Sequence, residues 1–300
     1  VGGFGMMLVV TGIYLWWPRR QTGGVLSVRG TPARRVFWRD THAVTGAIAG
    51  LVIFFLAATG MPWSGYWGGN ANAWLTTNGY GYPAELWDNV PASTKVTQDV
   101  LAKSGWIVEN APVPESQPAV AGGLAPAIGL DAAVAVARKA GMAPGFEMAL
   151  PGSDTGVYTA AIYPDNLAQE RTMHIDQYSG KPLIDISYPQ YPAFGRLIEW
   201  GINVHMGQEW GTFNQILMAV TCASIILMCV SGVVMWWKRR PSGRLGVPPM
   251  PPRKSVYIGL WAIALVFGLA FPMSGIAIVV MILIDQVILR FVPPLRRIFS

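Results

Sequence analysis

The chain has 300 residues, of which 52% are hydrophobic and 13% are charged, and its mean hydropathy is +0.37. Such a composition is typical of a membrane protein and argues against an ordinary soluble domain. The formal net charge of +6 comes mainly from basic residues that flank apolar segments. It therefore indicates membrane topology, and we expect no nucleic-acid partner.

Four apolar runs follow along the chain, at residues 1–17, 42–61, 213–237 and 257–289. A helix that spans a bilayer needs about 20 apolar residues, so the second and third runs are suitable. The last run would make a helix of roughly 50 Å, against a hydrocarbon core of about 30 Å. Pro272 interrupts it, and a proline inside a helix breaks or kinks it. We expect two short helices in a hairpin there, and one kinked helix is the alternative.

Basic residues are concentrated in the short segments between these runs. Residues 18–40, residues 238–254 and the C-terminal tail hold 15 of the 22 lysines and arginines, whereas residues 63–208 hold seven against 13 acidic residues, a local net charge of −6. Loops rich in Lys and Arg face the cytoplasm in membrane proteins. The long acidic segment is therefore expected outside, which for a bacterial inner membrane is the periplasm.

The expected fold class is a membrane all-α helical bundle with an inserted extracytoplasmic α+β domain, in a multi-pass protein surrounded by the lipid bilayer. Its expected parts are a truncated transmembrane helix (1–17), a cytoplasmic loop (18–40), a transmembrane helix (41–62), the extracytoplasmic domain (63–208), a transmembrane helix (209–237), a second cytoplasmic loop (238–255) and a C-terminal transmembrane hairpin or kinked helix (256–290).

The chain contains an internal repeat at an offset of 220 residues: residues 10–20 align without gaps with residues 230–240. Each copy has a small residue and a glycine before two tryptophans and a pair of arginines. Any helix that leaves a membrane could end in aromatic and basic residues, but the shared small–Gly pair favours a true repeat. By this offset the equivalent of His205 would lie about fifteen residues before Val1, so we expect the natural chain to begin earlier.

The outer domain shows only a coarse pattern. Residues 63–81 are rich in Gly, Trp and Asn and are interpreted as a loop, and the Pro-, Ala- and Gly-rich residues 111–127 as a linker. Asp131 is expected to cap a helix over residues 132–140. Strands are predicted at residues 157–163 and 171–176. A helix followed by strands indicates a small α+β unit.

Residues 171–183 resemble the strand–turn–strand signature of a PepSY domain, which places a PepSY-like unit at about 129–187. The helix exits at residues 12–20 and 232–240 resemble those of the PepSY-associated transmembrane family. So do two segments that each contain a histidine, Trp38-Arg39-Asp40-Thr41-His42-Ala43-Val44-Thr45-Gly46 and Asn203-Val204-His205-Met206-Gly207. The likeness covers essentially the whole chain.

This resemblance implies a function that composition and spacing do not. Members of the family are often described as iron-regulated, PiuB-like membrane proteins, and some are similar to inner-membrane ferric-siderophore reductases that carry haem between helices. The implied cofactor is haem b, two per full-length chain, and the implied substrate is a ferric siderophore or another ferric chelate on the outer side. The electron donor and the catalytic residues are not identified. The alternative is a non-enzymatic binding or regulatory protein that uses its PepSY unit to hold a partner.

His42 is the first of two expected haem ligands. It begins the second apolar run at the cytoplasmic side, and Gly46 and Gly50 lie four and eight residues further on, on the same helix face. Small residues beside a histidine leave room for a flat porphyrin. They are equally the pattern of close helix packing, and both interpretations stay open.

His205 is the second expected ligand, and it enters the next span from the opposite face of the membrane, so it cannot share one iron with His42. As a haem ligand, each histidine needs a partner from another helix. We expect these partners in the segment before Val1. Two haem groups would then connect the two sides of the membrane for electrons.

His174 lies between Thr172 and Asp176 on one face of a predicted strand, with Met173 and Ile175 on the other. A solvated strand face is the simpler interpretation of this pattern. A role for His174 in binding substrate is the alternative.

Overall fold

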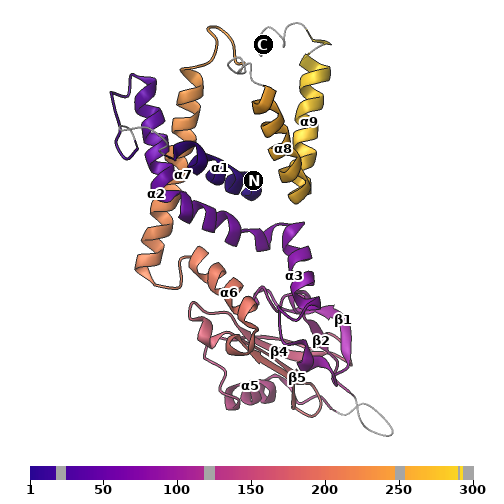
Figure 1. Ribbon diagram of the computed structural model, residues 1–300. Coiled ribbons are helices and arrows are strands. Elements are labelled where there is room, and N and C mark those ends of the chain that lie inside the picture. The colour runs from indigo at the N-terminus through magenta and orange to yellow at the C-terminus, as the bar shows by residue number, and fades with distance from the viewer. Residues whose placement is uncertain (18–24, 118–125, 247–253, 290, 293–300) are drawn as a thin grey trace. The chain divides into compact units, whose positions relative to one another are not determined.

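The computed structural model describes residues 1–17, 25–117, 126–246, 254–289 and 291–292 (Figure 1). It divides into two compact units, one made of Val1–Ala58 with Leu217–Ser300 and the other of Thr59–Ile216. The first unit is helical, and the second contains both sheets.

Long apolar helices make up the first unit. They are α1 (Gly2–Trp16), α2 (Arg35–Thr59), α7 (Thr212–Trp237), α8 (Lys254–Ala270) and α9 (Pro272–Leu283), followed by a π-helical segment, η5 (Ile284–Leu289). Helices α2 and α7 cross the boundary between the units. Two helical stretches, Arg35–Trp63 and Thr212–Trp237, are long and apolar enough to cross a membrane, with mean hydropathies of 2.1 and 2.4.

Helix α2 packs against α1 in the antiparallel direction. The side chains of Val9 and Ile13 on α1 lie over Gly50 of α2, and further along α2 the side chain of Ala57 lies near Gly5 at the start of α1. Small residues at both contact points let two helices approach closely, as they do between helices in membranes.

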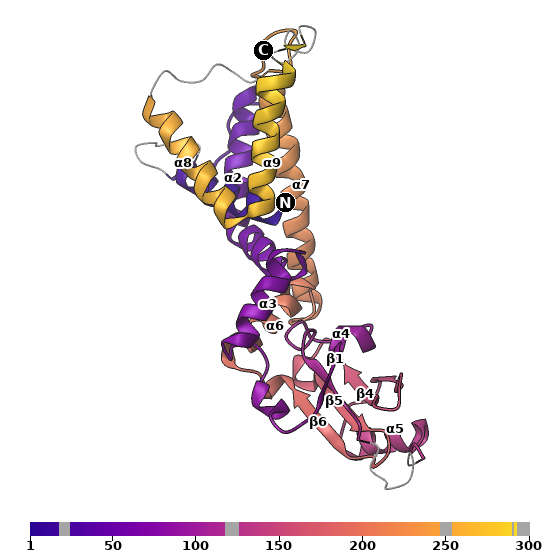
Figure 2. The same cartoon turned by 90° about the vertical axis from the view of Figure 1, so that its right-hand side faces the viewer.

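The expected interruption of the last apolar run is present at Phe271. Helix α8 ends at Ala270 and α9 begins at Pro272, in the first turn, where the missing N–H of a proline breaks no helical hydrogen bond. A Cβ added at Gly275 would lie 2.7 Å from the carbonyl oxygen of Gly268, so only glycines allow this approach. Both views show α8 and α9 extending from the break toward the same side, and they diverge in Figure 2 (Figures 1 and 2), which favours a hairpin over one kinked helix.

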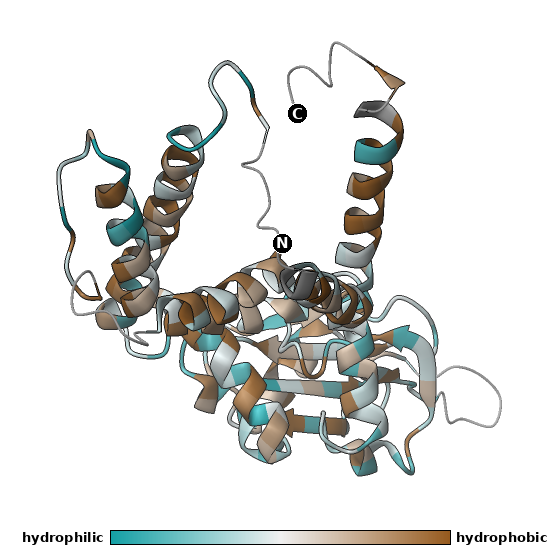
Figure 3. Cartoon of the chain, turned by 45° about the horizontal axis from the view of Figure 1, so that its top comes forward, coloured by the Kyte–Doolittle hydropathy of each residue, from teal (hydrophilic) through white to brown (hydrophobic). Residues whose placement is uncertain are grey.

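The helices of the first unit expose large apolar side chains. Leu51 is 78% exposed, Leu269 73% and Ile226 65%. Figure 3 shows hydrophobic residues, in brown, recurring along these helices. Exposed apolar surface of this extent marks a site of membrane or protein contact, and it suits a lipid environment here.

The second unit is α+β. Its helices are α3 (Trp67–Thr77), α4 (Thr97–Val100), α5 (Leu130–Lys139) and α6 (Ala193–His205), with short turns η1 (Met61–Trp63), η2 (Ala84–Trp87), η3 (Leu167–Gln169) and η4 (Tyr188–Gln190). Its strands are β1 (Ala92–Val96), β2 (Pro112–Pro114), β3 (Glu147–Ala149), β4 (Val157–Ile162), β5 (Arg171–Asp176) and β6 (Pro182–Ser187). Strands β1 and β2 pair with each other, and β3 to β6 form an antiparallel sheet in chain order.

The four-stranded sheet is covered on both faces. One face packs on α5 around Met173 and Ile175, which are fully buried (Figure 2). The other face presents Ile184 and Ile186 of β6 to a second core that includes Ile107. Strand β5 is therefore buried on both faces, whereas an antiparallel sheet commonly leaves one face exposed to water.

The strands predicted at residues 157–163 and 171–176 are confirmed as β4 and β5, and the predicted helix as α5. The expected cap is wrong. Helix α5 begins at Leu130 after Gly129, whose φ is +82°, so Asp131 lies inside the first turn and makes no capping hydrogen bond. Residues 111–127 are also not a linker at their start, because Pro112–Pro114 forms β2; residues 118–125 lie outside the described part.

Residues 63–81 are not a loop, because helix α3 occupies most of them. Gly68 lets α3 approach the carbonyl group of Pro62 so closely that any Cβ would collide with it. Asn72 Nδ2 donates a hydrogen bond of 2.7 Å to the carbonyl oxygen of Trp106, 34 residues along the chain. Long-range contacts therefore stabilise a helix whose Gly and Asn content alone disfavours one.

Candidate functional site

His42 lies in the third turn of α2, not at its start, because the helix begins at Arg35. Its Nδ1 lies 3.1 Å from the carbonyl oxygen of Met228 and 2.9 Å from Ser231 Oγ, both on α7. Ser231 Oγ itself donates to the same carbonyl oxygen. Since a carbonyl only accepts, this contact suits the tautomer of imidazole that has its proton on Nδ1. The lone pair then lies on Nε2, the nitrogen through which such an imidazole binds a metal.

The glycines near His42 contact neighbouring helices. A Cβ at Gly46 would lie 3.2 Å from Met228 Cε, and Gly50 contacts α1. Gly232 of the second repeat copy faces His42, whose Cε1 would lie 3.9 Å from an added Cβ. These contacts favour the packing interpretation of Gly46 and Gly50. The Met228 methyl group ends a flexible side chain, so a haem role for these glycines stays a prediction.

His205 is the last residue of α6, and α7 begins only at Thr212. His205 therefore lies at the end of a separate helix and precedes the apolar helix α7. Gly207, with φ of +80°, ends α6 in the left-handed conformation typical of helix C-termini. His205 Nδ1 lies 2.9 Å from Oγ1 of Thr59, the last residue of α2, and the Trp63 ring lies 6.2 Å from the imidazole, tilted by 52°. A hydroxyl and an aromatic ring thus position this histidine.

His174 is only 1% exposed, so the expectation of a solvated strand face is wrong. Its Nδ1 forms a 2.9 Å hydrogen bond with Thr159 Oγ1 on the paired strand β4. Burial lowers the pKa of His174 to about 3, so the ring is neutral at physiological pH. A ring enclosed inside the unit cannot contact a substrate that arrives from solvent, which also removes the substrate role suggested for it.

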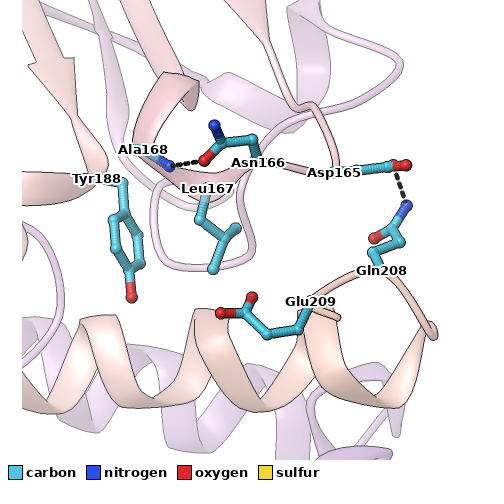
Figure 4. Close-up of a pocket in the computed structure, with 7 residues that line it drawn as sticks. All are labelled: Asp165, Asn166, Leu167, Ala168, Tyr188, Gln208 and Glu209. Carbon is cyan, nitrogen blue, oxygen red and sulfur yellow. Dashed lines mark hydrogen bonds between the residues drawn. The ribbon is translucent and has the colours of Figure 1, made fainter. Parts of the chain in front are cut away.

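A pocket of about 390 Å³ lies in the second unit, and sequence reasoning missed it (Figure 4). Its lining comes from the β4–β5 connection, from η4 and from the turn after α6, and consists of Asp165, Asn166, Leu167, Ala168, Tyr188, Gln208 and Glu209. Figure 4 shows Leu167, Tyr188 and Glu209 pointing into the same space. The pocket is therefore concave and carries two carboxylates, from Asp165 and Glu209.

Hydrogen bonds fix the acidic lining of this pocket. Gln208 Nε2 donates to Asp165 Oδ1 at 2.7 Å, and Asn203 Nδ2 donates to Glu209 Oε2 at 2.6 Å. Asn203 also donates to the carbonyl oxygen of Asp165. No motif in the sequence links residues 165–168 with residues 203–209, because the contact depends on how α6 returns to the sheet.

Two glutamates buried in the same unit, Glu170 and Glu199, were also missed. Strands β5 and β6, the turn η4 and the first part of α6 separate them in the sequence, and neither belongs to a recognisable motif. Only their surroundings in the structure mark them, because the hydroxyl groups of Tyr163 and Tyr191 donate hydrogen bonds to the two carboxyl groups.

Comparison with known proteins bears on the family. The family profile described as the PepSY-associated TM region matches residues 1–239, which include both candidate membrane helices and the four-stranded sheet. No curated protein matches the chain. The match covers more than half of the chain, and the resemblance noted from the histidine segments and the helix exits is confirmed. The chain therefore belongs to the PepSY-associated transmembrane family, and it is a membrane protein.

Proposed function

We propose that this protein is a haem-dependent electron-transfer protein of the bacterial inner membrane, which reduces ferric siderophores or other ferric chelates on the outer side. The observation that carries the proposal is the setting of His42. Its Nδ1 lies 3.1 Å from the carbonyl oxygen of Met228 on another apolar helix, a contact that suits the tautomer in which Nε2 is the basic nitrogen.

The residues around His42 would suit a histidine that holds the iron of haem b. In metal sites, a ligating histidine commonly donates its other ring N–H to a carbonyl or carboxylate, which fixes the tautomer and the orientation of the ring. Met228 and Ser231 provide this support from α7. Bound haem would supply a one-electron iron couple in an apolar environment.

Ion pairs stabilise the N-terminal part of α2, two residues before His42. Asp40 is 1% exposed and accepts from both Arg29 and Arg39 at 2.7 Å. The buried carboxylate is thus compensated on two sides, and it adds no unpaired negative charge two residues from His42. The pair with Arg29 holds the segment before α2 against the turns of the helix that lead to His42.

His205 would hold the outward haem. Thr59 Oγ1 orients its ring, and Gly201 lets α6 approach the Thr59 side chain, since an added Cβ would lie 3.1 Å from Cγ2. The pocket beside Gln208 and Glu209 belongs to the same unit and has a volume within the range of ligand sites. This pocket is the proposed place where a chelate binds in the unit that contains His205.

Sealed vesicles test the proposal. The protein, produced from its complete natural gene, is reconstituted with a trapped reductant, and a ferric chelate and a ferrous-iron indicator are supplied outside. We expect external ferrous iron to form in haem-loaded vesicles and to stay at the protein-free rate in vesicles made with protein from haem-deficient cells. Equal rates in the two preparations would contradict the proposal and favour the alternative, a non-enzymatic binding protein.

A further inference from the structure

Two carboxyl groups meet inside the second unit. Glu170 directly precedes β5 and is 1% exposed, and Glu199 lies in the middle of α6 and is 0% exposed. Both face Gly105, where an added Cβ would collide with Glu170 Oε1 and lie 3.2 Å from Glu199 Oε1. The absence of a side chain at Gly105 therefore leaves the space into which both carboxyl groups point.

The two carboxyl groups have unequal hydrogen-bond partners. Glu199 accepts from the Ile107 N–H at 2.7 Å and from the Tyr163 hydroxyl at 3.1 Å, one at each oxygen. Glu170 Oε1 accepts from the Tyr191 hydroxyl at 2.8 Å, whereas its buried Oε2 has no hydrogen-bond partner in the described part of the chain. A buried carboxylate oxygen without a donor is costly, so the site favours a proton on Glu170.

Burial and mutual repulsion act in the same direction on the pair. Burial, and then the charge of Glu199, raise the pKa of Glu170 well above its usual value. Burial raises the pKa of Glu199 to about 7, against the opposing effect of its hydrogen-bond donors. The other ionisable groups that face the pair are Glu109, Tyr163, Tyr188 and Tyr191, and Arg196 and Glu209 act in turn on Tyr188. Among the described residues, no lysine or arginine forms an ion pair with either glutamate.

The carboxyl site is one of several contacts between helix α6 and the rest of the second unit. Glu199 projects from the middle of α6 and binds the backbone of Ile107. On the same helix, Ile202 is buried in the core that contains Ile107, and Asn203 donates to the carbonyl oxygen of Asp165. The Glu199 hydrogen bonds are thus a polar contact within an otherwise apolar interface.

We propose that Glu170 and Glu199 form a proton-binding site that fastens α6 to the sheet of the second unit, and that loss of the bound proton loosens α6. When Glu199 loses its proton, its negative charge lies in a buried site that it shares with a second carboxyl group, Glu170, and that has no basic partner among the described residues. Because His205 is the last residue of α6, the surrounding pH then sets how firmly the helix that carries this histidine is held. The inference concerns the second unit alone and does not depend on haem binding.

The direction of the pH effect follows from the raised pKa values. The ordinary pKa of a glutamate is 4.5. Between this pH and about pH 7, Glu199 binds more protons in the folded protein than it does in the unfolded chain. The stabilising contribution of the protonated pair is therefore complete below about pH 4.5 and is lost as the pH rises through about 7. An acidic surface group with an ordinary pKa would give no such change near neutrality.

Hydrogen exchange of the α6 amides in the full-length protein tests the proposal, with rates corrected for the intrinsic effect of pH. From pH 5.5 to pH 8 we expect protection of α6 to fall by about tenfold, the change that corresponds to one unit of pKa. In Glu199→Gln the fall should shrink to less than about twofold, because no charge can form there. The matched control is Glu147→Gln, an exposed glutamate of β3, which should behave like the wild type.

A second variant decides the matter if Glu199→Gln does not fold. Tyr163→Phe removes only a hydroxyl that stabilises the charged form of Glu199. It should move the midpoint of the loss of protection to higher pH, which a merely structural role for the hydroxyl would not do. A wild-type α6 whose protection does not change with pH, a Glu199→Gln variant that keeps the full change, or a Tyr163→Phe midpoint that stays or moves down would each overturn the proposal.

Discussion

Each of the single variants His42→Ala and His205→Ala should lose about half of the haem and nearly all transmembrane reduction of an external ferric chelate. From the sequence we expect the two histidines at opposite faces of a membrane about 30 Å thick, too far apart to share one iron. Each variant should therefore lose one haem and keep the other, whereas electron transfer needs both. The measurements are haem content per chain and the vesicle assay described above.

His174→Ala is the control for the histidine variants. His174 is buried within the sheet of the second unit and hydrogen-bonded to Thr159, so its loss should lower stability through a cavity and leave the haem per folded chain unchanged. Full haem content in both His42→Ala and His205→Ala would show that neither residue is a ligand. The binding-module alternative would then replace electron transfer.

Gly68→Ala should destabilise the second unit by about 2 to 3 kcal/mol, an overpacking effect at the upper end of what single methyl groups cause. The added Cβ would collide with the carbonyl group of Pro62. Backbone atoms cannot rotate away as a side chain can, so η1 and α3 would have to separate. Thermal unfolding of the full-length protein in detergent measures the effect.

The neighbouring glycine provides a matched control for Gly68→Ala. Gly69 lies in the same helix, and an added Cβ would meet nothing within 4 Å. Gly69→Ala should leave stability unchanged or raise it by up to about 1 kcal/mol, because alanine favours a helix more than glycine does. Equal melting temperatures for the two variants would contradict the close approach of α3 to Pro62.

Patterns of neighbouring residues in the sequence correctly predicted the elements that depend on local residue preferences. Strands β4 and β5 follow from runs rich in β-branched and aromatic residues, and the break at Phe271 follows from Pro272. Alternation along β5 was also correct, since Met173 and Ile175 share one core. What it could not predict is the burial of His174, because the second face of the sheet is covered by residues distant in the sequence.

Errors arose where distant contacts or overlooked glycines decide the structure. Helix α3 forms in a Gly- and Asn-rich segment because Asn72 bonds to Trp106 and Gly68 fits against Pro62. By contrast, the end of α6 at His205 had a readable signal in Gly207, a residue type that commonly ends helices. The pocket and the Glu170 site combine residues from separate elements, and no spacing in the sequence reveals them.

Haem content of the protein purified from its complete natural gene is the most direct test of the proposed function. A reduced-minus-oxidised spectrum and a pyridine haemochrome assay give the type of haem and the amount per chain. The proposal predicts a b-type spectrum and about two haems per chain, one for each side of the membrane. Folded protein that carries no haem after growth with sufficient iron and haem supply would contradict it.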